Sequence, residues 1–98
     1  MVVLSQEAEL QLIALIRHYE ALDQRDAARN LLLAVEAAIA RITSTPEAGL
    51  IAPRPYPALT RFGLRWIHER CYWFSYTPDT PPVMAGIFYE MADIPNRI

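Results

Sequence analysis

A proline-rich stretch near the middle of the chain sets the main limit on how this sequence folds. Residues 43–60 carry four prolines and a glycine at short intervals. No helix survives that spacing, and proline is excluded from central strands. The stretch therefore predicts one long connection over the surface. It divides the 98-residue chain into two parts with different periodicity.

The first part predicts a short strand and two amphipathic helices. Residues 1–4 are apolar and include two β-branched valines, and Ser5 is a favoured N-cap for a helix over about residues 6–22. Asp23 is expected to cap a second helix, which runs to about residue 42. Both helices repeat apolar residues at three- and four-residue spacing. Because only a few polar residues join them, we expect a helical hairpin.

The second part predicts three strands. Residues 64–70, 71–77 and 83–89 are rich in β-branched and aromatic residues, and a proline-rich turn separates the last two runs. The order β-α-α-β-β-β predicts a single α+β domain over residues 1–98, with the helical hairpin packed on a small antiparallel sheet.

Both faces of this sheet are expected to need a cover, because neither of the last two runs alternates cleanly between apolar and polar residues. The helical hairpin covers one face. The long connection, the C-terminal tail, another copy of the chain or a partner chain covers the other. We favour a partner, since exposed apolar patches usually mark interaction sites.

Composition narrows the class of protein. The longest apolar run has seven residues, whereas a membrane helix needs about 18. The first basic residue is Arg17, so the chain does not begin like a signal peptide. One cysteine, Cys71, forms neither an internal disulfide nor a cysteine zinc cluster. No metal-ligand or phosphate-loop spacing occurs either, so we expect a cytoplasmic domain without a cofactor or a metal.

All nine basic residues are arginines, and the net charge is −2. An acidic balance argues against a general or sequence-specific nucleic-acid-binding protein. The charge is unevenly distributed, with four arginines against seven acids in residues 1–49 and five against four in residues 50–98. Residues 54–70 hold four arginines and a single acid, Glu69, which makes a local positive patch possible. The alternative is a set of solvated arginines with buried stems.

Four segments of the chain occur in the order of a known pattern. A strand leads into a helix (LSQEAELQLIALIRHYE), and a second helix ends in a Pro-Glu-x-Gly turn (AARNLLLAVEAAIARITSTPEAG). A strand pair follows (GLRWIHERCYWFSY), and then a closing segment (FYEMADIPNRI). Together these segments resemble the RelE/ParE family of type II toxin–antitoxin toxins, and the ParE branch most closely. The resemblance covers nearly the whole chain.

This resemblance implies a toxin that inhibits DNA gyrase without bond chemistry. It also implies a small cognate antitoxin, ParD-like or of another kind, that neutralises the toxin in a hetero-oligomer. The RelE branch implies a different activity, that of a ribosome-dependent mRNA endoribonuclease. A third alternative is a module with the same fold that binds its antitoxin but is not toxic.

The residues favour the first or third of these alternatives over the ribonuclease. RNA cleavage needs a base, an acid and cations at the phosphate, yet the chain has no lysine, and Tyr89 stands where the family commonly has a histidine. A residual catalytic set pairs two arginine phosphate clamps with one acid or base: Arg65 and Arg70 with Glu69, Glu90 or Tyr89. Residues 65 and 70 fall on opposite faces of a strand, so the two clamps do not converge. Trp66 and Trp73 are interpreted as core residues rather than base-stacking platforms.

Two candidate interaction surfaces follow. Target contact or toxicity is assigned to the first strand after the connection and to the closing segment: Arg61, Arg65, Arg70, Tyr89, Glu90, Asp93, Ile94, Pro95 and Arg97. The antitoxin is expected along the first helix and the strand edge: Leu10, Ile13, Tyr19, Tyr72, Phe74 and Phe88. A core position is the favoured alternative for Tyr72 and Phe74. Asp93 has an alternative role as the cap of a final turn.

Overall fold

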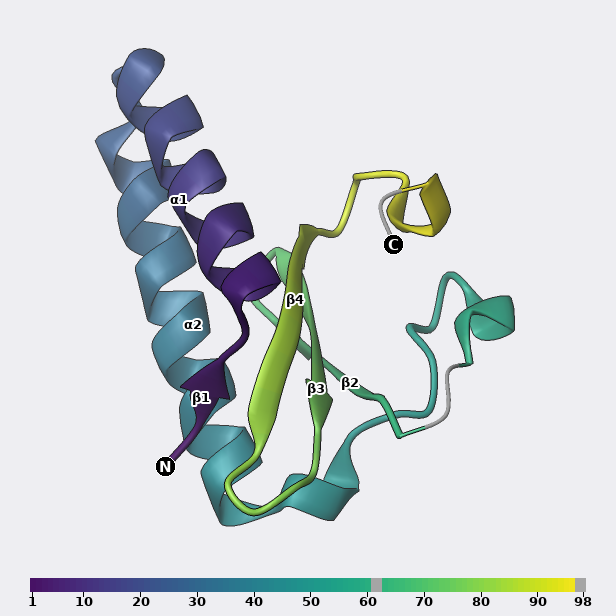
Figure 1. Cartoon of the computed structure of the whole chain (residues 1–98). Coiled ribbons are helices and arrows are strands. Elements are labelled where there is room, and N and C mark those ends of the chain that lie inside the picture. Colours follow the sequence, from purple (N-terminus) through teal and green to yellow (C-terminus); the bar gives the residue numbers. More distant parts are fainter. Residues whose placement is uncertain (61–62, 97–98) are drawn as a thin grey trace.

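The helical hairpin forms the first half of the chain, as predicted. The structure is a computed structural model that describes residues 1–60 and 63–96. Helix α1 (Gln6–Ala21) begins at Ser5, whose Oγ accepts a hydrogen bond from the Ala8 N–H at 3.1 Å. Helix α2 (Arg25–Ser44) then packs antiparallel to α1 (Figure 1). The expected N-cap at Ser5 is therefore confirmed.

The expected N-cap at Asp23 is wrong. Asp23 has a φ of 52°, and its N–H bonds to the Glu20 carbonyl at 3.0 Å, so it closes the end of α1 in a left-handed conformation. The N-cap of α2 is Gln24, which makes no side-chain capping hydrogen bond. Asp23 reverses the chain between the two helices instead of starting the second one.

The strands form a mixed four-stranded sheet of order β1-β4-β3-β2. Strand β2 (Arg65–Glu69) pairs antiparallel with β3 (Tyr72–Thr77), which pairs antiparallel with β4 (Val83–Tyr89). The two-residue strand β1 (Val3–Leu4) joins the other edge of β4 in parallel. The α+β fold and the element order are confirmed, and the sheet carries one parallel pair beside its antiparallel ones.

Helix α2 continues to Ser44, two residues into the predicted connection. The rest of the connection, described here over residues 45–60, contains no α-helix, only the 3-10 turns η1 (Pro46–Ala48) and η2 (Pro57–Leu59). Between them, Leu50 pairs with Trp66, each N–H bonding the other's carbonyl at 2.7 Å. This bridge covers part of the outer edge of β2, which would otherwise present unpaired backbone groups. Neither α1 nor α2 has the length and hydrophobicity of a bilayer-spanning helix.

The main core lies between the helical hairpin and one face of the sheet. Both layers contribute buried apolar side chains, which form one cluster: Ala8, Leu31, Ala34, Val35, Ala38 and Ile42 from the helices, and Ile67, Tyr72, Phe74, Tyr76, Met84 and Ile87 from the strands. The alternating residues of β3 that face the helices are thus Tyr72, Phe74 and Tyr76. This face is covered as the sequence predicts.

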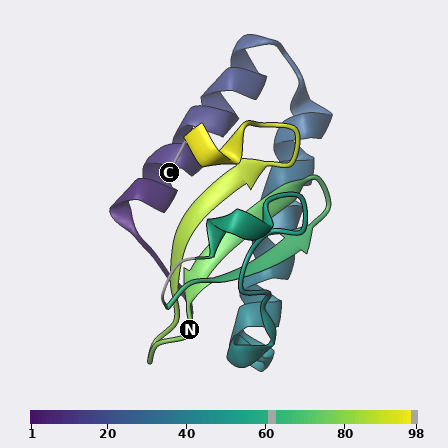
Figure 2. The same ribbon diagram turned by 90° about the vertical axis from the view of Figure 1, so that its right-hand side faces the viewer.

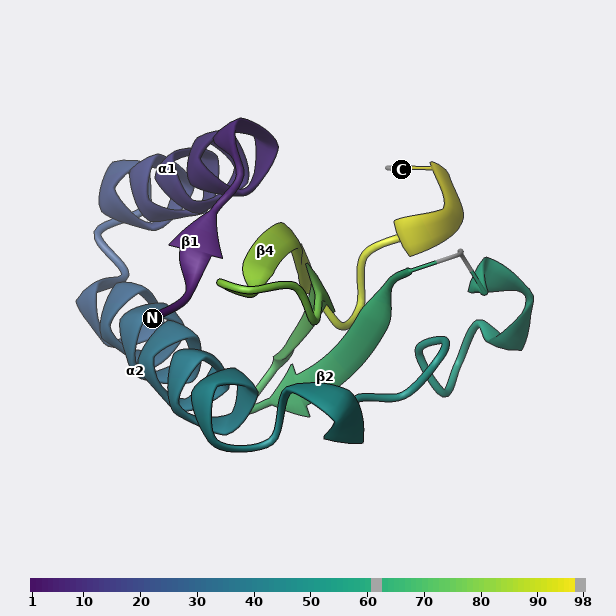
Figure 3. The same ribbon diagram turned by 60° about the horizontal axis from the view of Figure 1, so that its bottom comes forward.

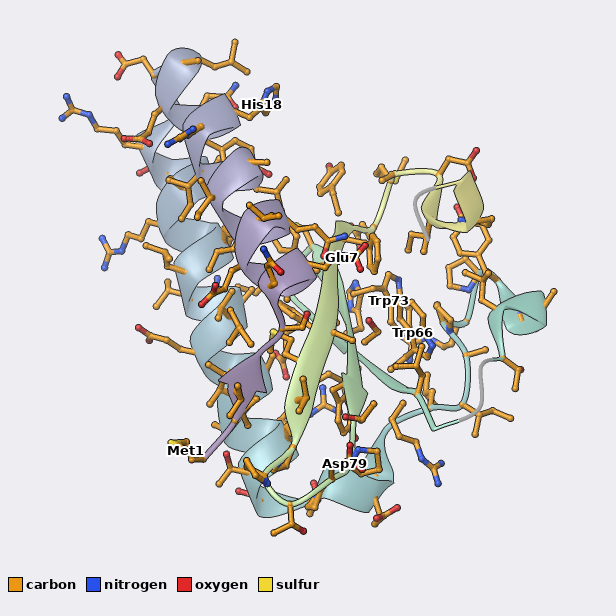
Figure 4. All side chains as sticks on the ribbon, viewed as in Figure 1. Met1, Glu7, His18, Trp66, Trp73 and Asp79 are labelled. Carbon is orange, nitrogen blue, oxygen red and sulfur yellow. The ribbon has the colours of Figure 1, made fainter. Side chains whose placement is uncertain are left out.

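The opposite face of the sheet is covered by the chain itself, so the expectation of a partner there is wrong. Leu59 of η2 and Ile94 of η3 (Ile94–Asn96) pack on Trp66, Trp73 and Phe88 in a second buried cluster. Figure 2 shows both short helices lying across the strands, and Figure 3 shows them opposite α1 and α2. Trp66 and Trp73 point away from the helical hairpin (Figure 4) and are almost fully buried. Their predicted core positions are confirmed.

Candidate functional site

Of the arginines assigned to the target surface, the two that the structure describes, Arg65 and Arg70, do not meet. Arg65 is at the start of β2. Its Nη2 lies 3.7 Å from Glu47 Oε2, and its Nη1 donates to the Gly49 carbonyl at 3.5 Å. Arg70, in the turn after β2, has a φ of 56° and donates to Asn30 Oδ1 at 2.7 Å. Each of these two side chains therefore has its own partners, and the two lie at opposite ends of β2. Arg61 and Arg97 lie outside the described residues.

The closing segment after β4 divides into exposed and buried positions. Tyr89 is 41% exposed, and Asp93 and Pro95 are also exposed. Ile94 is fully buried in the second cluster, so its assignment to target contact is wrong. The physical reason is that Ile94 anchors the segment on the sheet. The η3 turn follows directly after Asp93, where a final turn was expected.

The structure brings together one ionisable pair that the sequence analysis did not assign. His68 Nε2 on β2 lies 2.7 Å from Glu90 Oε2, one residue beyond β4. Their side chains are 25% and 37% exposed. An imidazole beside a carboxylate forms a strong hydrogen bond and is a common acid–base arrangement. Of the predicted acid–base candidates, Glu90 alone acquires a histidine partner among the described residues.

Neighbouring side chains hold this His68–Glu90 pair in place. The His68 ring packs on Trp73 with a centroid distance of 4.9 Å, and the Arg54 guanidinium lies 5.0 Å from the Trp73 ring centroid. Arg41 of α2 donates to the His68 carbonyl and to Glu69 Oε1, both at 3.0 Å. The predicted acid or base Glu69 is therefore in an ion pair with α2, separate from Glu90.

A groove of about 960 Å³ runs between α1 and the end of β4. Its walls are mostly apolar or uncharged: Gln11, Ala14, Leu15, His18 and Tyr19 on α1, Gln24 and Ala27 at the start of α2, and Ile87, Phe88, Tyr89, Met91 and Ala92 on the sheet side. Strand β1 pairs with Val83 and Met84, so among the described strands none lies beside the later half of β4 on this side. There the Ile87 N–H donates to the Gln11 side chain at 2.9 Å.

The predicted antitoxin residues separate into surface and core. Leu10 and Ile13 on α1 are 60% and 45% exposed, and Tyr19 lines the groove. Tyr72, Phe74 and Phe88 are buried, so their assignment to an antitoxin surface is wrong. The helices cover the first two, and the second cluster encloses Phe88.

The hydroxyls of Tyr19 and Tyr72 share a hydrogen bond where the groove meets the core. Burial, followed by this hydrogen bond, raises the pKa of the Tyr72 hydroxyl well above its ordinary value. The Tyr89 ring lies 5.9 Å from the Tyr72 ring in an edge contact. Burial therefore favours the protonated form of the Tyr72 hydroxyl.

Comparison with known protein families finds no match to the chain, and a search of curated proteins finds no relative. Within residues 1–60 and 63–96, no three His, Cys, Asp or Glu side chains gather closely enough to ligate a metal ion. The candidate site thus consists of the turn after β4, the His68–Glu90 pair behind it and the groove in front of it.

Proposed function

We propose that this chain is the toxin of a type II toxin–antitoxin pair and that it acts as a ParE-like inhibitor of DNA gyrase. On this proposal it works in the cytoplasm by contacting its target protein and breaks no bond itself. A small cognate antitoxin neutralises it in a hetero-oligomer.

The observation that carries this proposal is the exposure of Tyr89 and Met91 in the turn at residues 89–92. Tyr89 is 41% exposed and Met91 is 77% exposed, and both line the groove beside α1. Aromatic and methionine side chains are enriched in protein–protein interfaces. The separation of Arg65 from Arg70 adds support, because a phosphodiester-cleaving site needs cations that converge on one phosphate.

The antitoxin is proposed to cover the outer surface of α1. Leu10 and Ile13 are exposed one turn apart on that helix, next to the groove-lining residues of the same element. Residues three positions apart share a helix face, so an apolar partner segment can contact both.

The His68–Glu90 pair favours a second candidate function, that of a RelE-like ribosome-dependent ribonuclease. In RNA cleavage by transesterification, a base takes the proton of the 2′-hydroxyl, the 2′-oxygen attacks phosphorus, and an acid protonates the leaving 5′-oxygen. Glu90 is a candidate base and a protonated His68 a candidate acid. The pair remains the second candidate because both arginines near it are engaged elsewhere. Arg41 donates to the His68 carbonyl and to Glu69, and Arg54 lies against the Trp73 ring.

Pulse-labelling of DNA and protein synthesis after induction of this chain alone in a bacterial host separates the candidates. The proposal expects DNA synthesis to fall first. An earlier fall in protein synthesis would overturn it and favour the ribonuclease. If neither falls while the protein accumulates in folded form, the chain is a non-toxic antitoxin-binding module. Purified gyrase supplies the direct test, since the chain should block its supercoiling of plasmid DNA.

A further inference from the structure

His68 ties the closing segment to the far edge of the sheet. Its Nε2 lies 2.7 Å from Glu90 Oε2, and so it joins β2 to the first residue after β4. We propose that His68 is a positioning residue whose hydrogen bond to Glu90 fixes the turn at residues 89–92 and holds Tyr89 and Met91 towards the groove. This inference rests on the proposed function, in which that turn contacts the target.

The turn has side chains directed to two sides. Tyr89 and Met91 line the groove beside α1, whereas Glu90 between them reaches His68 on β2. The Ala92 N–H donates to the Tyr89 carbonyl at 2.9 Å and closes the turn. Because consecutive side chains of a short turn are directed to different sides, fixing the middle one fixes the direction of its neighbours.

His68 is itself held rigidly enough to act as an anchor. Its ring packs on the buried Trp73, and Arg41 of α2 donates to its backbone carbonyl at 3.0 Å. The charged groups around it are Glu90 in direct contact, Arg41 at its carbonyl and Arg54 beyond Trp73. Because His68 is held in this way, Tyr89 and Met91 present one conformation to the target. A single conformation lowers the entropic cost of binding.

The other contacts of the closing segment act on its backbone, on the Tyr89 ring and at its far end. The Glu90 N–H donates to the Cys71 carbonyl at 2.9 Å, and the Tyr89 ring makes an edge contact with the Tyr72 ring. Ile94 is buried in the second cluster, and the Tyr56 hydroxyl donates to the Ala92 carbonyl at 3.3 Å. These contacts keep the segment on the sheet, but none of them holds the Glu90 carboxylate, which meets His68. Loss of the His68–Glu90 bond should therefore loosen the turn while the fold stays intact.

Five variants test this role. Glu90→Ala and His68→Phe remove the hydrogen bond, and the phenylalanine keeps a ring on Trp73. His68→Gln and Glu90→Gln keep a donor and an acceptor at the two positions. Glu36→Ala is the matched control, since it removes the same charge from an exposed site on α2. Two quantities are measured: amide hydrogen exchange of residues 89–92 in the free chain, and the concentration that half-inhibits gyrase supercoiling.

We expect Glu90→Ala and His68→Phe to exchange about tenfold faster in the turn and to inhibit about tenfold more weakly, as loss of one charge-assisted hydrogen bond predicts. Glu36→Ala should stay close to the unsubstituted chain in both measurements, and the two glutamine variants should exchange in the turn at rates close to those of the unsubstituted chain. Recovery by glutamine separates a positioning hydrogen bond from simple filling of space.

Three results would overturn the inference. The first is an amide hydrogen-exchange rate at residues 89–92 that is the same in Glu90→Ala as in Glu36→Ala. The second is faster exchange with unchanged inhibition, which makes the bond a structural contact only. The third is glutamine variants whose turn exchanges as fast as the turn of Glu90→Ala. If the unsubstituted chain fails to inhibit gyrase, the proposed function falls, and the exchange rates still decide whether His68 fixes the turn.

Discussion

The hydroxyl of Tyr76 joins β3 to the start of the long connection. It donates to the Pro46 carbonyl at 2.6 Å and accepts from the Gly49 N–H at 3.1 Å, on a fully buried side chain. The approach requires glycine at residue 49, because a Cβ there would lie 2.5 Å from the Tyr76 hydroxyl oxygen. One phenol thus fixes the turn that ends the helical half of the chain.

Tyr76→Phe keeps the ring and leaves both backbone groups of the connection without this partner. We expect the free energy of unfolding to fall by about 1–3 kcal/mol, as measured by urea denaturation. Tyr89→Phe is the control, because Tyr89 is 41% exposed, and it should change stability by less than about 0.5 kcal/mol. Equal effects of the two substitutions would contradict this account of Tyr76.

The buried phenols also predict how stability depends on pH. Burial raises the pKa of both Tyr72 and Tyr76 above the ordinary value of 10.0. Because the folded state favours the protonated phenol, this contribution to stability is complete below about pH 10 and is lost as the pH rises through the folded-state pKa.

Urea denaturation between pH 8 and 11 should show the free energy of unfolding falling from about pH 10 upwards, by at most about 1.4 kcal/mol per pH unit for each phenol. Tyr72→Phe should make this fall shallower, since it removes one of the two groups. Parallel profiles for the two proteins would show that Tyr72 does not contribute.

At the scale of elements, the two helices begin in different ways. The Ser5 Oγ caps α1 and also donates to the Ala85 carbonyl of β4 at 3.3 Å, whereas Gln24 at the start of α2 has no capping bond. We expect Ser5→Ala to lower the free energy of unfolding by about 1 kcal/mol, measured by thermal or urea denaturation. Gln24→Ala removes no such bond and serves as the control. A larger loss from Gln24→Ala would mean that capping does not explain the difference.

Elements with a local signal were predictable from the sequence. Ser5 marks the start of α1, and the proline-rich turn before β4 marks a strand boundary, so these positions agree within about a residue. Strand β1 has two residues, and its parallel pairing with β4 depends on a neighbour about eighty positions away. The role of Asp23 was missed because an aspartate is common both at N-caps and in left-handed positions, and local sequence does not separate the two.

The His68–Glu90 pair can be predicted only when the register of the strands is known. His68 pairs with Trp73, and Trp73 pairs with Phe88, so these three side chains share one face of the sheet. Glu90 is two residues beyond Phe88 and continues on that face, and its carboxylate meets His68 although β3 lies between β2 and β4. Without the lengths of both hairpins, the sequence separates the two residues by 22 positions and gives no reason to join them.

At the scale of the whole molecule, three layers determine which apolar surface remains for a partner. The helical hairpin covers one face of the sheet, and the connection and the closing segment cover the other (Figure 3). Leu59 and Ile94 cover the second face. Both are isolated apolar residues in proline-rich surroundings, so no periodic pattern predicts that they are buried. Exposed apolar side chains beside the proposed site are then found on α1 and in the turn after β4: Leu10, Ile13, Tyr89 and Met91.

The burial of the aromatic cluster on the second face of the sheet should depend on Ile94. This side chain is fully buried against the aromatic cluster although it belongs to a short C-terminal turn. Ile94→Ala leaves a cavity and weakens the hold of the closing segment, so we expect a loss of about 2–5 kcal/mol of unfolding free energy. Binding of the dye ANS should rise as Trp66 and Trp73 become accessible.

Ile13→Ala is the matched control for this substitution. It removes the same atoms from a side chain that is already 45% exposed, so it should cost less than about 1 kcal/mol and leave ANS binding unchanged. A similar loss from both substitutions would mean that Ile94 contributes no more than a surface residue. The second face would then need a cover from outside the chain, and a partner on the aromatic cluster would again be required to explain the apolar residues on both sides of the sheet.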